Sequence, residues 1–168
     1  MMHTTFLIRP MQPEDWPAVE AIYEEGIRSG VATFETQSPG WDLWDRHHIP
    51  DMRLVGVIDD EITGWVALSP VSSRQVYRGV AEVSVYVGSR YRGKGIGLAL
   101  LEKIVALSES AGFWTVQAGI FALNAASIRL HTCAGFRMIG YRERPAQLHG
   151  VWYDTVLMER RSLVAGGA

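Results

Sequence analysis

A glycine-rich stretch near the middle of the chain has the residue types and spacing of an anion-binding turn. It reads Arg90-Tyr-Arg-Gly-Lys-Gly-Ile-Gly97 and leads into apolar residues at three- and four-residue spacing, up to Gly112. Alternating glycines leave the backbone open, so several N–H groups can converge on an anion beside the positive end of a helix. The arginines and the lysine add positive charge. The expected ligand is a phosphate group, and the alternative is a loop with solvated cations.

Two commoner phosphate-binding motifs do not fit this stretch. A P-loop needs Ser or Thr after Gly-Lys, whereas Lys94 is followed by Gly95. A dinucleotide fingerprint needs the spacing G-x-G-x-x-G, whereas these glycines alternate. The pattern therefore argues against a nucleoside triphosphatase and against a dinucleotide-dependent enzyme.

A carboxylate precedes the glycine turn. The segment Ala81-Glu-Val-Ser-Val-Tyr-Val87 alternates apolar and polar residues, which predicts a strand with one apolar and one polar face. Glu82 lies on the polar face, although glutamate is depleted in strands. Glu82 is therefore a candidate general base, and the alternative is a solvent-facing glutamate with no catalytic role.

Three polar side chains recur later at helical spacing. Asn124 is a good N-cap for a short helix that ends at Gly135. Ser127 and His131 follow at i+3 and i+7, so all three residues can face one cleft. Instead of facing a cleft, His131 could be a surface histidine, or a core histidine whose hydrogen bonds are made within the protein.

Composition limits the classes of partner and cofactor. A net charge of -2 and a pI near 6.2 give no basic field of the kind that nucleic-acid binding needs. His47 and His48 have no partner at metal-ligand spacing, so we expect no metal and predict a cationic helix end there. Cys133 is the only cysteine, which excludes an internal disulfide, and we expect it to be buried in the core.

The two ends of the chain and its length lead to three further expectations. Residues 1–5 lack a basic segment followed by an apolar one, and no apolar run reaches membrane-spanning length, so we expect a cytoplasmic protein without a membrane partner. A chain of 168 residues fits one domain. Residues 163–168 are expected to form a frayed tail.

The remaining pattern predicts the elements that must hold these groups. Apolar periodicity and breaker residues indicate strands at 5–9, 53–58, 62–68, 114–121, 136–141 and 151–158. They also indicate helices from residue 13, at 38–48 and at 124–135. These elements add to the strand at 81–87 and to the helix after the glycine turn. Antiparallel strands come first and a βαβα pattern follows. This order predicts a single α/β domain whose mixed, mostly antiparallel sheet is flanked by helices.

Two motifs resemble those of one enzyme superfamily. Arg92-x-x-Gly95-x-Gly97 resembles the acyl-CoA pyrophosphate loop of the GNAT N-acetyltransferases. The spacing of Asn124, Ser127, Leu130-His131 and Gly135-Phe136 is similar to the pattern N-x-x-[AS]-x-x-L-[YH]-x-x-x-G-F of the same superfamily. The resemblance covers nearly the whole chain. It implies one GNAT domain over residues 1–168, with acetyl-CoA as co-substrate.

Within that superfamily the chain looks like the phosphinothricin and methionine sulfoximine acetyltransferases. The resemblance lies in residues 31–36, 81–87, 127–131 and 149–154. It implies acetyl transfer to the α-amine of a small glutamate- or methionine-like amino acid, by a homodimer. At the position where the superfamily commonly has a tyrosine that protonates the leaving thiolate, this chain and the phosphinothricin group have histidine, here His131.

The resemblance also implies roles for individual residues. A backbone N–H near Val85 or Tyr86, at a local bulge, would stabilise an oxyanion. The residues implied to bind the cofactor are Val85, Tyr86, Val87, Arg92, Gly93, Lys94, Gly95, Ile96, Gly97, Leu98, Asn124 and Ser127. A zwitterionic substrate needs a cation and an apolar wall, and the candidates are Thr33, Phe34, Glu35, Arg74, Tyr77 and Arg78. Other hypotheses are a GNAT enzyme for polyamines, aminoglycosides or protein N-termini, and a catalytically silent acyl-CoA sensor.

Overall fold

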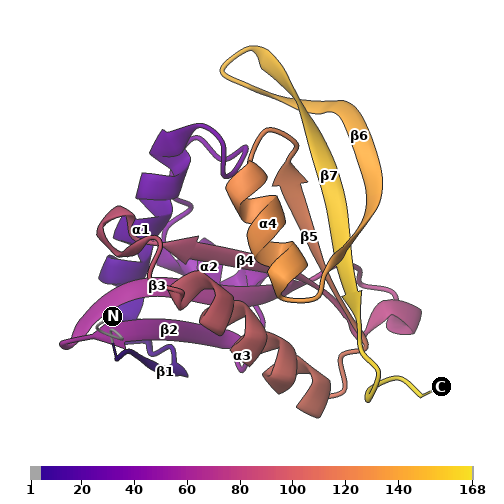
Figure 1. Ribbon diagram of the computed structural model, residues 1–168, viewed down its shortest axis with the longest axis horizontal. Helices are drawn as coiled ribbons and strands as arrows, with labels where there is room; N and C mark the ends of the chain where they lie inside the picture. Colours follow the sequence, from indigo (N-terminus) through magenta and orange to yellow (C-terminus); the bar gives the residue numbers. More distant parts are fainter. Residues whose placement is uncertain (1–4, 168) are drawn as a thin grey trace.

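A seven-stranded sheet of order β1-β2-β3-β4-β5-β7-β6 runs through the computed structural model, which describes residues 5–167 (Figure 1). The pairing of β4 with β5 is parallel and all other pairings are antiparallel. The strands are β1 (Leu7–Pro10), β2 (Arg53–Ile58), β3 (Glu61–Pro70), β4 (Val80–Val87), β5 (Thr115–Phe121), β6 (Arg137–Leu148) and β7 (Val151–Arg161). This arrangement confirms the expected mixed, mostly antiparallel sheet of a single α/β domain.

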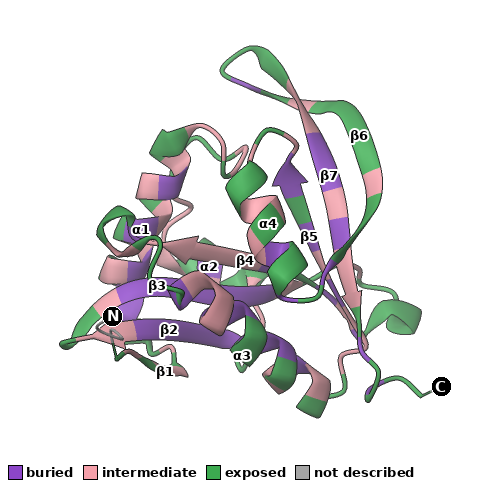
Figure 2. Cartoon of the chain, in the orientation of Figure 1, coloured by how far each residue is buried: buried purple, intermediate pink, exposed green. Residues whose placement is uncertain are grey.

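Helices cover both faces of the sheet. They are α1 (Trp16–Ser29), α2 (Trp41–His47), α3 (Ile96–Ser110) and α4 (Ala125–Cys133). Helices α1 and α2 bury Val19 and Trp44 against Val55 and Trp65 on one face, whereas α3 buries Leu100 on the other. Successive side chains of a strand point to opposite faces, so apolar runs such as that of β3 are buried on both sides (Figure 2).

The hairpin between β2 and β3 forms where the sequence predicts it. Asp59 and Asp60 have φ of 48° and 64°, the left-handed conformation that both central residues of a type I′ turn require. Aspartate tolerates this conformation better than most residues. The tight turn pairs β2 with β3, and the other edge of β3 pairs with β4, the strand that carries the candidate base.

The polar face expected for β4 is only partly polar. Glu82 is exposed, but the Tyr86 ring stacks on Trp65 at 4.9 Å and meets Tyr23 edge-on at 5.1 Å. Burial raises the pKa of the Tyr86 hydroxyl. Helix α1 packs over the carboxyl-terminal half of β4, so Tyr86 becomes part of a core. The polar character of this face is therefore limited to the first half of the strand.

Two expectations about single residues are wrong. Cys133 is exposed instead of buried, because it lies in the last turn of α4 on the side away from the sheet. His48 is not part of a cationic helix end, since its ring stacks on Trp44 at 4.1 Å and burial lowers its pKa. The proximity of Arg53, whose guanidinium lies over the same indole, further lowers that pKa.

The carboxyl-terminal segment contains a hairpin and the residues that follow it. Strands β6 and β7 form a long hairpin that projects beyond the helices at the top of Figure 1. After β7, Arg161 donates hydrogen bonds to the carbonyl groups of Ser162 at 2.8 Å and Ala165 at 2.9 Å, and Ala165 is buried. Leu163 and Val164 between these contacts are exposed, and the frayed tail stays a prediction. Its last residue, like residues 1–4 of the expected leaderless N-terminus, lies outside the described part of the chain.

Within residues 5–167, no helix is both long enough and apolar enough to cross a membrane. In the same part of the chain, no three His, Cys, Asp or Glu side chains gather as metal ligands would.

Candidate active site

Strands β4 and β5 pair only at their beginnings and then diverge (Figure 1). Their parallel register runs from Val80 opposite Thr115 to Glu82 opposite Gln117. Beyond this point β4 stays paired with β3, and β5 stays paired with β7 as far as Phe121. The second half of β4 therefore has an edge that no strand of the described chain covers.

The backbone groups on this edge follow from the pairing of β4 with β3. The N–H of Gly88 donates to the carbonyl of Thr63 at 2.9 Å, and backbone direction alternates along a strand. Tyr86 therefore directs its N–H toward β3, whereas Val85 and Val87 direct theirs toward the divergence. The register between β3 and β4 is continuous, so the bulge expected near Val85 is absent from this pairing. Of the two predicted oxyanion donors, only Val85 has the required direction.

The glycine turn connects β4 to α3 in a conformation that favours glycine. Gly93 and Gly95 have φ of 75° and 81°, and Gly95 is the N-cap of α3. A 3₁₀ turn, Ser89–Tyr91, precedes them, and the side chains of Arg92 and Lys94 are exposed beside the turn. The guanidinium of Arg92 reaches back to the Val87 carbonyl, with Nε 3.4 Å from the oxygen.

The start of α3 has the properties of an anion site. The first intrahelical bond there is donated by Ala99 to the carbonyl of Gly95 at 3.1 Å, so the N–H groups of Ile96, Gly97 and Leu98 point out of the helix end. The absence of a side chain at Gly97 lets this end lie close to α4, because a Cβ there would be 3.3 Å from a methyl group of Leu130. Free N–H groups and nearby cations thus combine at the start of α3, as an anion site requires.

Glu82 stands at the closed end of the divergence. Its carboxylate accepts a hydrogen bond from the side-chain amide of Gln117, with Oε2 3.3 Å from Nε2. Both residues belong to the last pair before the strands separate. Glu82 is exposed and Gln117 is half-buried, so the carboxylate is accessible from the face that carries α1.

Both the oxygen and the nitrogen of the Asn124 side-chain amide make hydrogen bonds within the protein. The oxygen accepts from the N–H of Ser127 at 3.1 Å, which confirms the predicted N-cap of α4. The nitrogen donates to the carbonyl of Val31 at 3.1 Å and so ties α4 to the loop between α1 and α2. Neither contact requires a ligand.

The surroundings of His131 differ from those expected of an acid in a cleft. Its side chain is only 3% exposed and its ring packs edge-on against Phe136 at 5.2 Å. Nδ1 lies 2.8 Å from the carbonyl oxygen of Ser127, and because a carbonyl can only accept, Nδ1 carries the proton of the neutral ring. Burial lowers the pKa of His131. The structure therefore places His131 among core residues, with its Nδ1 proton bonded to Ser127.

The candidate substrate residues form two groups at opposite ends of β5. Phe34 packs on Phe121, the last residue of the strand, with ring centroids 4.4 Å apart. Arg78 lies over the ring of Trp114, just before the strand begins, at 5.2 Å. Seven residues of strand separate these anchors by about 23 Å. Gln117, and with it Glu82, lies between the two groups.

The other substrate candidates accompany these anchors. The hydroxyl of Thr33 accepts from the N–H of Glu35 at 3.1 Å and lies beside the phenols of Tyr23 and Tyr86. Burial and the nearby Glu35 carboxylate raise the pKa of Tyr23. At the other end Arg74 lies 5.4 Å above the Tyr77 ring, and both side chains are exposed. The site is thus open at the arginine end and lined by aromatic rings at the other.

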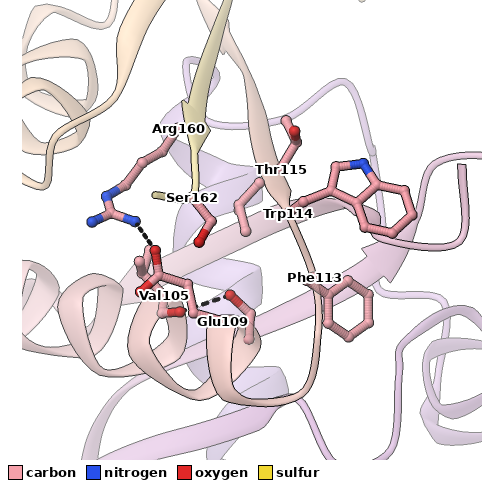
Figure 3. A pocket seen from close by; sticks show the side chains of 9 residues that line it. Val105, Glu109, Phe113, Trp114, Thr115, Arg160 and Ser162 are labelled. Carbon is pink, nitrogen blue, oxygen red and sulfur yellow. Dashed lines mark hydrogen bonds and ion pairs between the residues drawn. The ribbon is translucent and has the colours of Figure 1, made fainter. Parts of the chain in front are cut away.

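A surface depression at the far end of α3 is unrelated to these groups (Figure 3). It lies between Phe113, Trp114 and the end of β7, and an ion pair of Arg160 with Glu109 at 2.8 Å crosses it. This pair lowers the pKa of the Glu109 carboxyl. The depression is about 20 Å along α3 from the glycine turn. The side chains that line it fill it.

The chain belongs to the acetyltransferase (GNAT) family, whose family model matches residues 16–136. The two parallel strands that diverge, β4 and β5, the glycine turn at the start of α3 and the carboxylate on β4 all lie within that match. The chain is therefore an acetyl-CoA-dependent N-acetyltransferase, which confirms the enzyme class expected from the two motifs.

Individual relatives agree in class and in length. A phosphinothricin N-acetyltransferase of Alcaligenes faecalis is 31% identical over 160 residues, covering 91% of this chain and 81% of the relative. An L-methionine sulfoximine/L-methionine sulfone acetyltransferase of Pseudomonas aeruginosa is also 31% identical, covering 90% and 92%. The solved phosphinothricin acetyltransferase of Sinorhizobium meliloti, in complex with acetyl-CoA, superposes with a TM-score of 0.86 at 30% identity, covering 98% of this chain and 91% of that one.

Sequence reasoning missed Gln117. A signal was present, because an amide alternates there with the apolar Val116 and Ala118, and a polar residue in such a position calls for a partner. That partner could not be named from the pattern, since the register between β4 and β5 joins residues 35 positions apart.

Proposed function

We propose that this enzyme transfers the acetyl group of acetyl-CoA to the α-amine of a small amino acid with a glutamate- or methionine-like side chain. The relatives at about 30% identity carry the names of such enzymes. The observation that carries the proposal is the position of Glu82, exposed at the closed end of the diverging strands, with Arg78 beyond one end of β5 and Phe34 at the other.

The glycine turn suits the pyrophosphate of acetyl-CoA. Its positive φ angles, the N–H groups at the start of α3 and the side chains of Arg92 and Lys94 match the charge and shape of a phosphate. The outward N–H of Val85 is aimed at the region where an acetyl thioester would lie if the pantetheine arm followed the uncovered edge of β4. In that position it would stabilise the oxyanion of the tetrahedral intermediate.

Glu82 would accept the proton of the attacking amine. An α-amino group has a pKa of about 7.7–8.0, so much of it is protonated at neutral pH and cannot attack a thioester. The exposed carboxylate can take that proton directly or through a water molecule. The thiolate of CoA would then leave without a proton from His131, whose only proton is bonded to Ser127.

The two ends of β5 offer complementary contacts to such a substrate. Gln117 is about 10 Å from Trp114 and about 13 Å from Phe121 along the strand. A guanidinium side chain can span much of the first distance, so Arg78 or Arg74 could pair with the substrate carboxylate. The rings of Phe34 and Phe121 would contact the aliphatic part.

Comparing kcat/KM for methionine sulfone and spermidine, with release of free thiol as the readout, tests the substrate class. We expect methionine sulfone to be preferred by at least about tenfold, since cationic side chains repel a polyamine and like-charge juxtaposition costs several kcal/mol. Preference for spermidine would contradict the amino-acid proposal and leave the acetyltransferase class intact.

We further propose that the enzyme is a cytoplasmic homodimer. Support for self-association comes from exposed apolar side chains of the β6–β7 hairpin, including Tyr141, Val151 and Trp152, which a monomer would leave in water. An open hollow lined by Glu143, Arg144 and Trp152 lies near its tip. Light scattering of the purified protein gives its mass directly, and a mass of one chain at micromolar concentration would contradict the dimer.

A further inference from the structure

A row of polar residues crosses the sheet at the level of Glu82. Following the register from β3 to β6, the consecutive partners are Ser69, Glu82, Gln117, Glu159 and Arg137. Directly paired residues of neighbouring strands project their side chains from the same face. The candidate base is therefore one member of a continuous polar row.

Gln117 stands between two carboxylates in this row. On one side its Nε2 donates to Glu82 Oε2 at 3.3 Å. On the other side is Glu159, whose Oε1 accepts from the guanidinium of Arg137 at 2.5 Å. Arg137 thus neutralises the Glu159 carboxylate, whereas the uncharged amide of Gln117 contacts the Glu82 carboxylate. A glutamine can donate two hydrogen bonds without adding charge.

We propose that Gln117 is a positioning residue for Glu82, an inference that rests on the proposed role of Glu82 as the base. By donating to Oε2, the amide restricts the rotation of a side chain that is otherwise exposed. It leaves Oε1 available to the amine. Because the donor is neutral, it orients the carboxylate without placing a cation beside it.

The other neighbours of Glu82 do not orient its carboxylate. On the β3 side the neighbour is Ser69, which carries no charge. In the structure the two arginines of the preceding segment lie over aromatic rings, Arg74 over Tyr77 and Arg78 over Trp114, instead of against the Glu82 carboxylate. Beyond Gln117 the charged groups are Glu159 and Arg137, which pair with each other.

Two substitutions of similar size separate positioning from folding. Gln117→Leu removes the donor and keeps the volume, and we expect kcat to fall about three- to tenfold, with unchanged KM for acetyl-CoA and unchanged thermal stability. Gln117→Glu places a second carboxylate beside Glu82. We expect the acidic limb of its kcat/KM profile to move to higher pH, because two adjacent carboxylates retain a proton between them.

Ser69→Ala is the matched control, since it changes the other neighbour of Glu82 in the same row without removing a donor to it. We expect its kcat and pH profile to match those of the unmodified enzyme. If Gln117→Leu keeps full kcat, or if Gln117→Glu leaves the acidic limb in place while Glu82→Gln is inactive, the positioning role is overturned and Glu82 remains the base. If Glu82→Gln is fully active, the proposed function of Glu82 fails and the inference fails with it.

Discussion

The side-chain amide of Asn124 donates a hydrogen bond to the carbonyl of Val31 at 3.1 Å, across 93 positions of the chain. This bond connects the start of α4 to the loop that carries Phe34. The same side chain caps α4 by accepting from Ser127. One residue therefore joins two segments that border the site from different parts of the sequence.

Asn124→Asp should separate these two contacts. The carboxylate keeps the cap acceptor but cannot donate to Val31, so we expect a several-fold higher KM for the amine with little change in thermal stability. Asn124→Ala should also lose the cap, at about 1 kcal/mol of stability. Measuring both KM and the melting temperature for each variant checks this prediction, and equal KM values for Asn124→Asp and the unmodified enzyme would contradict it.

Gly95→Ala should weaken acetyl-CoA binding by strain in the turn. Its φ of 81° is unfavourable for any residue with a Cβ, at about 1 kcal/mol or more, although no atom lies within 4 Å of the added group. Gly112→Ala is the matched control, because that glycine has φ of 89° and equally open surroundings at the other end of α3. Calorimetry should show weaker binding for Gly95→Ala only; equal losses in both variants would refute the location of the pyrophosphate.

Glu82→Gln should retain acetyl-CoA affinity and lose kcat by about 10²–10⁴-fold, the usual range for removal of a general base. The amide has nearly the same shape as the carboxylate but cannot accept the amine proton. Glu102→Gln, at an exposed position of α3, removes the same charge far from the site and should behave like the unmodified enzyme. Steady-state kinetics at neutral pH decide the matter, and wild-type turnover by Glu82→Gln would rule out the role.

His131 should affect stability more than catalysis. Burial lowers its pKa below the value of 6.5 that it has in the unfolded chain. As the pH falls through 6.5, the unfolded state therefore binds a proton that the folded state does not bind, and the folded state loses stability. We expect His131→Gln to flatten the stability profile between about pH 6.5 and 5.

The same variant distinguishes a core residue from an acid. We expect its kcat to fall less than tenfold, because the proton on Nδ1 is bonded to Ser127 and does not face a leaving group. Chemical denaturation at several pH values measures the first effect, and kinetics measure the second. A kcat loss of a hundredfold in a folded His131→Gln enzyme would restore the histidine as the acid.

The sequence by itself determined the features that depend on a few neighbouring residues. The hairpin around Asp59 and Asp60, the glycine turn before α3 and the cap at Asn124 each follow from the conformation or hydrogen bonding of a short segment. For the same reason the strand that carries Glu82 could be predicted, and the order of the elements along the chain indicated the mixed sheet.

Only the tertiary structure decided which of these features meet. The register of β4 and β5 brings Gln117 to Glu82, the packing of α4 buries His131, and β5 separates Phe34 from Arg78. Each of these outcomes depends on pairing or burial between segments that are distant in the chain. A local pattern shows that a residue is polar or apolar, but the partner that satisfies it is chosen by the packing of the whole domain.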